Sequence, residues 1–393
     1  MKSKLNEKTA KIIFFAVAVV MMVLMIWFGV STDIDFGRNP LPDVTFPRGR
    51  VIEVISDQTA IDEGGLLRGQ QWFLVEILTG EHRGDIVQVS NIMFIDAPVN
   101  PQVGTVIILS FEYDEYHESY NARVHSYERE TAIYITILLF FGLIALIGGK
   151  AGLSSVFGLI FTFVTLLFLL VPAIIRGASP AIMTIALSIM IIAVSLITVM
   201  GFKKKTWASI FGTSIAIAFY CLFYFVIAAA LRISGFSIPE MSQLMAIGFT
   251  DTLKISELLF CGILIASLGA VMDTSVSVAS ATAELSATGS SHGFKPLLKS
   301  SMRVVRDCVG SSANTLILAF TGTFFISLIL FRIHELNYTM LINRVDIAIE
   351  VLRAVSASAG MILSAPATAV IASHMYCVHS QKQDKINKSK QKA

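Results

Sequence analysis

Residues Leu258–Ser280 read LLFCGILIASLGAVMDTSVSVAS. As far as Val278, this stretch holds one charged side chain, Asp273, among apolar, small and hydroxyl residues. A transmembrane helix needs about 20 mostly apolar residues, because the hydrocarbon core of a bilayer is about 30 Å thick and each helical residue adds about 1.5 Å. The stretch therefore predicts a membrane-spanning helix that carries a carboxylate.

Seven other segments of the 393-residue chain are similarly long and apolar. Charged residues make up 15% of the chain and the mean hydropathy is +0.72, whereas a soluble domain has roughly 25% charged residues; this excludes a cytoplasmic globular protein. The first segment is too long for a signal peptide, so we expect an uncleaved anchor. We predict an α-helical polytopic membrane protein with about eight transmembrane helices: Ile12–Val30, Thr131–Gly148, Leu153–Ile175, Ala181–Met200, Trp207–Leu231, Leu258–Val278, Cys308–Phe331 and Ile347–Tyr376.

The distribution of lysine predicts the topology, because cytoplasmic loops carry an excess of Lys and Arg. With eight spans, one side receives the N-terminal lysines, Lys150, Lys203–Lys205, Lys295–Arg306 and the C-terminal tail. Residues 31–130 contain no lysine, and Lys254 is the only lysine assigned to the other side. We therefore expect both termini in the cytoplasm and residues 31–130 outside it.

Residues 31–130 show the alternating hydrophobicity of strands, separated by turn residues. Five short strands in so small a segment favour a closed, OB-like small barrel, since closure removes exposed edges; an open sandwich is the alternative. The predicted domains are thus 1–30, 31–130, 131–377 and a basic tail, 378–393. The predicted strands are Gly49–Ser56, Gln71–Leu78, Asp85–Ser90, Val106–Tyr113 and Ser119–Ser126.

The extracytoplasmic segment is strongly acidic. It holds 17 acidic residues and 7 arginines, which gives a formal charge of 7 − 17 = −10. This charge is compatible with an acidic vestibule that gathers cations above a pore. The simpler alternative is a solvated surface that avoids positive charge because it must cross the membrane.

Asp273 is the first candidate functional residue. It lies about 22 Å from the outer end of its span, where a carboxylate costs several kcal/mol unless it faces protein or water. Ser277 and Glu284 follow four and eleven positions later, on the same helical face. We predict that these residues line a polar path. The alternative is a structural hydrogen bond or ion pair between Asp273 and Arg306 or Asn314.

The seventh and eighth predicted spans also carry polar side chains. Asp307 and Asn314 lie two turns apart on one face, and Asn314 reaches about 9 Å into the membrane, roughly the level of Asp273. Glu350 and Arg353 form an i,i+3 pair that can neutralise itself near the outer surface.

The eighth predicted span contains two further signals. Small residues at every fourth position, Ser356, Gly360 and Ser364, allow a close helix contact. Pro366 frees a backbone carbonyl, and interrupted membrane helices often bound binding sites. In a short alignment of the sixth and eighth spans, Ser364 falls opposite Asp273.

Catalytic and metal-binding patterns are not found in the sequence. His334-Glu335 lacks the second histidine of a zinc protease motif, and Gly148-Gly149-Lys150 lacks the upstream glycine of a P-loop. The four cysteines form no CxxC motif. We therefore expect no enzyme activity, cofactor or metal. The net charge of +2 gives no reason to expect a nucleic-acid partner.

Several stretches resemble the YibE/F family of bacterial multi-spanning membrane proteins. The resemblance implies this architecture and a bacterial plasma membrane location, and it specifies no activity. Cys308 is a mild departure from the aliphatic residue that the family tends to have after its Arg-Asp. The stretches that carry the resemblance are Gly269–Asp273, Arg306–Phe320, Glu350–Arg353, and Ile77–Gly84 together with Asn91.

The leading functional hypothesis is a transporter or channel for a small solute or ion, with its polar site on helices six to eight. A non-transporting scaffold or sensor, whose outer barrel binds a partner, is the alternative. An intramembrane enzyme is the least supported hypothesis, since no catalytic pair exists. The expected partners are the lipid bilayer and an unknown solute or ion, and the sequence leaves a homo-oligomer open.

Overall fold

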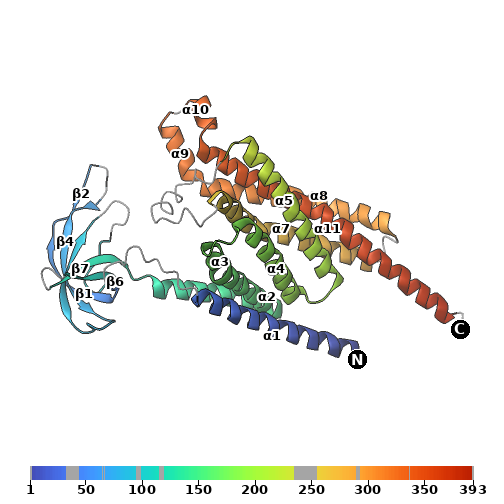
Figure 1. Cartoon of the computed structure of the whole chain (residues 1–393), viewed down its shortest axis with the longest axis horizontal. Helices are drawn as coiled ribbons and strands as arrows, with labels where there is room; N and C mark the ends of the chain where they lie inside the picture. Colours follow the sequence, from blue (N-terminus) through green and yellow to red (C-terminus); the bar gives the residue numbers. More distant parts are fainter. Residues whose placement is uncertain are drawn as a thin grey trace. The chain divides into compact units, whose positions relative to one another are not determined.

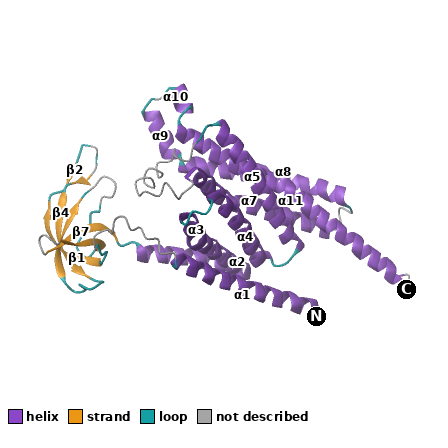
Figure 2. Cartoon of the chain, viewed as in Figure 1, coloured by secondary structure: helices purple, strands orange, loops and turns teal. Residues whose placement is uncertain are grey.

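The computed structural model describes residues 2–31, 44–63, 65, 67–93, 99–114, 119–233, 255–288, 293–335 and 337–391. The chain divides into two compact units (Figure 1). One is Asp33–Leu143, and the other combines Met1–Thr32 with Ile144–Ala393. The first is mostly β-structure and the second is helical (Figure 2).

Five strands of the first unit close into a barrel in the order β1-β4-β5-β7-β6, and β2 (Ala60–Ile61) and β3 (Leu67–Arg68) form a separate small sheet. β1 pairs antiparallel with both β4 and β6, and β5 pairs parallel with β7. The five predicted strands and the closed barrel are confirmed, so the open-sandwich alternative is wrong. The strands are β1 (Arg48–Asp57), β4 (Gln70–Ile77), β5 (Ile86–Ile92), β6 (Val106–Asp114) and β7 (Ser119–Tyr127).

The barrel core follows from the alternation of side chains along each strand. In β4, every second residue is buried, and Phe73, Val75 and Ile77 point inward. They pack with Val89 and Leu109 from neighbouring strands. Two irregularities in the register of β1 accompany its pairing with two different strands, since a β-bulge bends and twists a strand.

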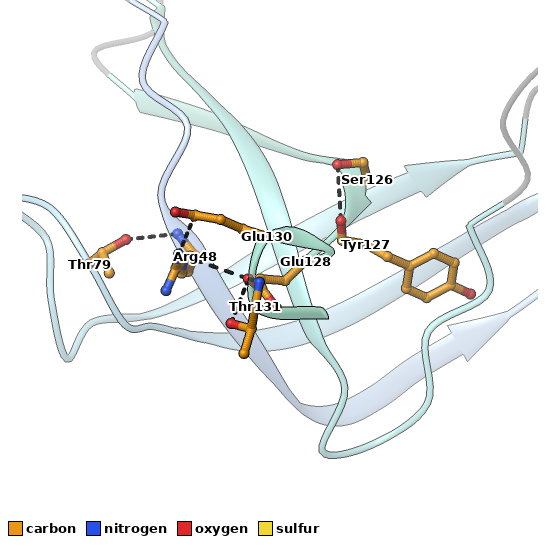
Figure 3. A network of polar contacts seen from close by, with 7 residues as sticks. All are labelled: Arg48, Thr79, Ser126, Tyr127, Glu128, Glu130 and Thr131. Carbon is orange, nitrogen blue, oxygen red and sulfur yellow. Dashed lines mark hydrogen bonds and ion pairs between the residues drawn. The ribbon is translucent and has the colours of Figure 1, made fainter. Parts of the chain in front are cut away.

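An ionic joint connects the barrel to the start of α2 (Glu130–Thr165), as Figure 3 shows. The guanidinium of Arg48 pairs with Glu130 and lies 3.9 Å from Glu128. The hydrogen bond and the charge of Glu130 raise the pKa of Arg48 above its usual value. Glu128 in turn accepts hydrogen bonds from the backbone N–H and hydroxyl of Thr131, at 3.0 and 3.1 Å. These contacts satisfy part of the first turn of α2.

The second unit is a bundle of long helices. Among the described residues, six helices are long and apolar enough to cross a membrane, or seven if the bent pair α8–α9 counts as one span. The helical elements beyond α2 are α1 (Lys2–Val30), η1 (Leu166–Leu170), α3 (Val171–Ile175), α4 (Pro180–Met200), α5 (Lys204–Ala230), α7 (Ile255–Ala287), α8 (Phe294–Thr323), α9 (Phe325–Ile333), α10 (Tyr338–Ile342) and α11 (Val345–Gln391).

The predicted number of eight spans depends on one segment. Two predicted spans, Thr131–Gly148 and Leu153–Ile175, lie in a single candidate segment, Glu130–Ile175. Gly149 lies between them and has a non-helical backbone, with φ 53° and ψ −130°. The seventh predicted span covers α8 and α9, which meet at an angle of 55°. The count of eight stays a prediction.

Helix α7 lies at the centre of the bundle and packs against α4, α5, α8 and α11. Helices α5 and α11 approach each other closely at small residues. A Cβ atom on Gly360 would lie 3.1 Å from the Cβ of Tyr220, and one on Gly212 would lie 3.0 Å from the Cα of Thr368. The close helix contact expected at Gly360 is therefore present.

Pro366 does not interrupt α11. The helix continues through this residue, so the break inferred from the proline is wrong. Proline removes one backbone hydrogen bond. Membrane helices tolerate that loss when neighbouring helices pack around them, and here Ala365 and Ala369 on either side are fully buried.

Candidate functional site

Two cavities in the helix bundle share one wall residue, Asp273 of α7. The first, which we call the polar cavity, has a volume of about 240 Å³ and lies between α7 and α8. The second, which we call the apolar cavity, has a volume of about 380 Å³ and is lined by α2, η1, α4 and α7. The carboxylate therefore stands where the two cavities adjoin.

The spacing of residues along α7 explains this position. Residues three and four apart share a helical face, and Ala270, Asp273 and Ser277 line the polar cavity. Gly269, Asp273 and Val276 line the apolar cavity. Asp273 belongs to both rows, since it lies at the border between the face toward α8 and the face toward α4.

Helix α8 supplies most of the hydroxyl groups of the polar cavity. Ser311 and Ser312 are neighbours, Cys308 and Thr315 lie three or four positions before and after them, and all four line it. The hydroxyl of Thr315 donates to the backbone carbonyl of Ser311 at 3.1 Å. The polar cavity can therefore offer both donors and acceptors to a small polar group.

The apolar cavity is built from long aliphatic side chains. Leu187 and Ile191 of α4 and Leu268 of α7 line it. Its wall also contains Leu166 and Leu170 of η1, a π-helical turn. Such turns in a longer helix are often found at functional sites, and here the turn shapes the wall opposite α7.

Asp273 is exposed on the surface of the bundle, and it forms no hydrogen bond or ion pair within the part of the chain that the structure describes. Arg306 and Asn314, the partners considered for a structural role, are both exposed and line neither cavity. The structure thus does not bring them to the carboxylate.

The other predicted site residues divide into two groups. Ser277 lines the polar cavity with Asp273. Glu284 and Asp307 are exposed and lie outside both cavities. Ser364 is buried, donates to the carbonyl of Met361 at 2.6 Å and does not line either cavity.

At the opposite end of α11, the ion pair between Glu350 and Arg353 is present, at 3.3 Å. Oε1 of Glu350 is buried and has no hydrogen-bond partner among the described residues. Pro366 is half-buried and lines neither cavity. Of the predicted set, the structure therefore groups Asp273 and Ser277 and separates them from the residues of α11.

Sequence reasoning missed two features of the site. One is the hydroxyl row of α8, although its spacing of three and four could have indicated it. The other is Glu257 in the first turn of α7, which accepts hydrogen bonds from the hydroxyl of Ser179 at 2.7 Å and from the backbone N–H of Ala181 at 3.0 Å. A carboxylate at a helix N-terminus is favourable, and this one joins α7 to α4, two helices that line the apolar cavity.

A family model described as YibE/F-like protein matches residues 136–377. The chain belongs to the YibE/F family. This YibE/F protein is an integral membrane protein, since the matched region contains the apolar helices α4, α5, α7 and α11. The match includes every residue that lines the two cavities and begins after the barrel, so the resemblance at Ile77–Gly84 and Asn91 stays a prediction. No curated protein and no solved structure was found to match.

The described residues of this YibE/F protein do not include a cluster of metal ligands. No group of three or more His, Cys, Asp or Glu side chains that could hold a metal ion occurs among them. What the arrangement offers instead is one carboxylate, a row of hydroxyl groups and an apolar wall. These groups can bind a solute, a cation or a proton without a resident cofactor.

Proposed function

We propose that the protein is a transporter or channel that moves a small solute or ion past Asp273, through the polar site of α7 and α8. The observation that supports it is a carboxylate on the shared wall of two cavities that has no partner among the described residues. Asp273 lies sixteen residues beyond Glu257, the first residue of its candidate span, which is about 24 Å along the helix.

The energetic argument is that an aspartate inside a membrane is costly. Insertion scales give about 2.5–3.5 kcal/mol for such a residue at the centre of a transmembrane helix. A residue that only filled space could be replaced by an apolar one at no such cost. A binding partner that brings positive charge or hydrogen bonds to Asp273 would offset this cost, and transport supplies that partner.

The proposal includes a topology of eight spans. Segment Glu130–Ile175 has 46 residues, about 69 Å of helix, which is more than twice the thickness of the hydrocarbon core. We infer that it forms two spans that separate at Gly149. An even number of spans then leaves both termini in the cytoplasm of a bacterial cell and the barrel outside.

The topology has a direct test. Single cysteines at exposed barrel positions should react with a membrane-impermeant thiol reagent in intact cells. Cysteines in place of Lys203, Lys204 and Lys205 should react only after the cells are opened. Labelling of the C-terminal tail from outside would contradict the eight-span topology.

We also infer that the barrel is OB-like. Its five strands form a closed barrel, and β5 and β7, the third and fifth barrel strands along the sequence, pair in parallel. This resembles the small five-stranded barrels of that class. The formal charge of −10 on residues 31–130 would attract cations on the outer side of the membrane.

Flux measurements test transport. Proteoliposomes with entrapped pH-sensitive and potassium-sensitive dyes should show proton or cation flux above that of protein-free vesicles. Asp273→Asn keeps the shape of the side chain and should reduce the flux by at least about tenfold, equivalent to about 1.4 kcal/mol. Asp307→Asn is the matched control, because Asp307 is exposed and lies outside both cavities. Equal flux in the wild type and Asp273→Asn would contradict the proposal.

A scaffold or sensor is the second candidate function, and the ionic joint favours it. Arg48 and Glu130 connect the first barrel strand to the first residue of α2. A partner bound by the barrel could therefore influence this helix. Two measurements test this function. The isolated barrel should capture a partner, and the purified full chain should show no flux. A homo-oligomer and the absence of a nucleic-acid partner stay predictions.

A further inference from the structure

We propose that the two cavities form one binding site for an amphiphilic cation. The cationic group would lie at Asp273, its polar surroundings would be the hydroxyls of α8, and its apolar part would lie between α2, α4 and α7. This inference rests on the proposed function, since it names the substrate class for the same site.

The apolar cavity is suited to a hydrocarbon group and unsuited to a hydrated ion. Its volume of about 380 Å³ falls within the usual range of ligand pockets, about 300–1,000 Å³. Most of its lining is apolar, and of its five hydroxyl groups two are engaged within α2: Ser155 donates to the carbonyl of Ala151 at 3.0 Å and Thr162 donates to that of Gly158 at 2.9 Å. A hard cation such as Ca²⁺ needs six to eight oxygen ligands, which this wall does not provide.

The polar cavity has the complementary character. The hydroxyls of Ser277, Ser311 and Ser312 form no hydrogen bond with any residue that the structure describes. They remain available to a headgroup or to the water around it. The cavity of about 240 Å³ has room for several water molecules.

Asp273 gives the proposed binding site a negative charge. Among the described residues, it is the only charged one on the wall of either cavity. A carboxylate without a cationic neighbour attracts positive charge and repels anions. A ligand that places an ammonium or phosphonium group at Asp273 and a hydrocarbon chain along α4 would satisfy both cavities at once.

Access from the bilayer is consistent with the same class of ligand. Asp273, Gly269 and Ser277 are exposed at the surface of the helix bundle. An amphiphile already dissolved in the membrane can reach such a surface sideways. A hydrated inorganic ion that took the same lateral route would have to give up its water in the hydrocarbon region, which is costly.

The first experiment measures binding to the full chain in lipid nanodiscs. Decyltrimethylammonium is the probe, and tetramethylammonium, which has the same headgroup without the chain, is the comparison. We expect saturable binding of the probe, at least about tenfold weaker binding of tetramethylammonium, and at least about tenfold weaker binding of the probe to Asp273→Asn. Variants are compared in the same lipid, so that partitioning into the bilayer cancels.

The second experiment fills the apolar cavity. Gly269 lines it, and a Cβ atom there would meet nothing within 4 Å. Gly269→Leu should therefore occupy the cavity without moving the backbone and weaken binding by at least about tenfold. Gly262→Leu is the matched control: this glycine is exposed on the same face of α7, has equal space, and lines neither cavity. It should bind within about twofold of the wild type.

The outcomes separate this inference from the proposed function. If the probe does not bind while flux of a small cation still depends on Asp273, the amphiphile inference is wrong and transport stands. If the probe binds in an Asp273-dependent manner and no flux occurs, the binding site stands and transport is wrong. Equal binding by the wild type and Asp273→Asn, or equal effects of Gly269→Leu and Gly262→Leu, would overturn the inference.

Discussion

The barrel and the helix bundle bury polar groups in opposite ways. In the barrel, the side-chain amides of buried Gln71 and Asn91 both donate two hydrogen bonds. Gln71 donates to Asp57 and to Asn100, both at 3.0 Å. Asn91 donates to Gln71 at 2.9 Å and to the Val99 carbonyl at 2.6 Å. This network connects β1, β4 and β5 to the segment before β6.

The helix bundle buries small and hydroxyl residues with less complete pairing. In α11, the buried hydroxyls of Ser356, Ser358, Thr368 and Ser373 have no hydrogen-bond partner among the described residues. Burial from water drives the barrel together, whereas lipid is as apolar as leucine, and helices associate in it by close packing. An unpaired hydroxyl is therefore ordinary in this bundle. Asp273 differs from these residues because it is charged and lines two cavities.

The largest expected effect compares one phenylalanine from each region. Phe73 of the barrel and Phe161 of α2 are both fully buried. Phe73→Ala should lower the free energy of unfolding of the barrel by about 3–5 kcal/mol. Phe161→Ala should cost the bundle less, because its side chain moves between protein and lipid and not into water.

Tryptophan fluorescence can follow the two regions separately. With Trp72 of β4 as the only tryptophan, the signal reports the barrel, and with Trp207 of α5 as the only tryptophan it reports the bundle. Both versions are full chains in mixed micelles, unfolded by increasing denaturing detergent. Equal losses for the two substitutions would contradict the difference in driving force.

Close packing of the bundle is tested at Gly212. A Cβ atom there would collide with the side chain of Thr368, so Gly212→Ala should lower the free energy of unfolding of the bundle by about 1–3 kcal/mol. Gly310 of α8 is exposed, and a Cβ there meets nothing within 4 Å. Gly310→Ala should therefore change this free energy by less than about 0.5 kcal/mol. If both variants lost equal stability, the loss at Gly212 would not come from its contact with Thr368.

The hydrogen bonding of buried amides in the barrel is tested at Asn91. Asn91→Ala leaves the buried acceptors on Gln71 and Val99 without their donor. Loss of such a partner costs about 1–3 kcal/mol, measured as unfolding of the Trp72 version. Ser356→Ala in α11 removes a buried hydroxyl that has no partner and should be close to neutral. A large loss at Ser356 would break the comparison between the regions.

The smallest expected effect is on how the stability of the barrel depends on pH. A hydrogen bond from the hydroxyl of Thr59, then one from the amide of Gln71, lower the pKa of Asp57 below its ordinary value. As the pH falls, the unfolded state therefore takes up a proton before the folded state does. The stabilisation from Asp57 is complete above the ordinary carboxyl pKa and is lost as the pH falls through the lowered folded value.

Substitution of Asp57 isolates this contribution. Asp57→Asn should flatten the acid limb of the stability profile measured with Trp72. Glu53→Gln, at an exposed carboxylate of the same strand, should leave it in place. An unchanged acid limb in Asp57→Asn would mean that other carboxylates account for it.

The two regions also differ in how well their elements could be predicted from the sequence. Strand alternation and turn residues are local signals, so the five barrel strands were predicted with their bounds nearly correct. The two-residue strands β2 and β3 were missed, because they are too short to show alternation. Hydropathy located the apolar helices, and the cost of a buried charge singled out Asp273.

The neighbours of Asp273 could not be predicted in the same way. Helical spacing shows which residues of one helix share a face, but the rotation of α8 toward α7 depends on tertiary packing. For that reason Asn314, which was predicted to lie at the level of Asp273, lines neither cavity, while Ser311 and Ser312 line the polar cavity. The break predicted at Pro366 is absent because one lost hydrogen bond does not break a well-packed helix.

Transport past Asp273 requires that the polar cavity be open to water within the membrane, and a cysteine at residue 315 tests this most directly. Thr315 lines that cavity and lies seven residues beyond Cys308, the first residue of the predicted span, which is about 10 Å along the helix. In a background without other cysteines, a charged methanethiosulfonate reagent should label Thr315→Cys in intact membranes, since the reagent acts on thiolates in water. In the matched control, Leu318→Cys in the same background, the thiol lies at an exposed site of α8 outside both cavities and should stay unlabelled. Labelling at residue 315 without labelling at residue 318 is the predicted result, and an unreactive cysteine at residue 315 would contradict the account.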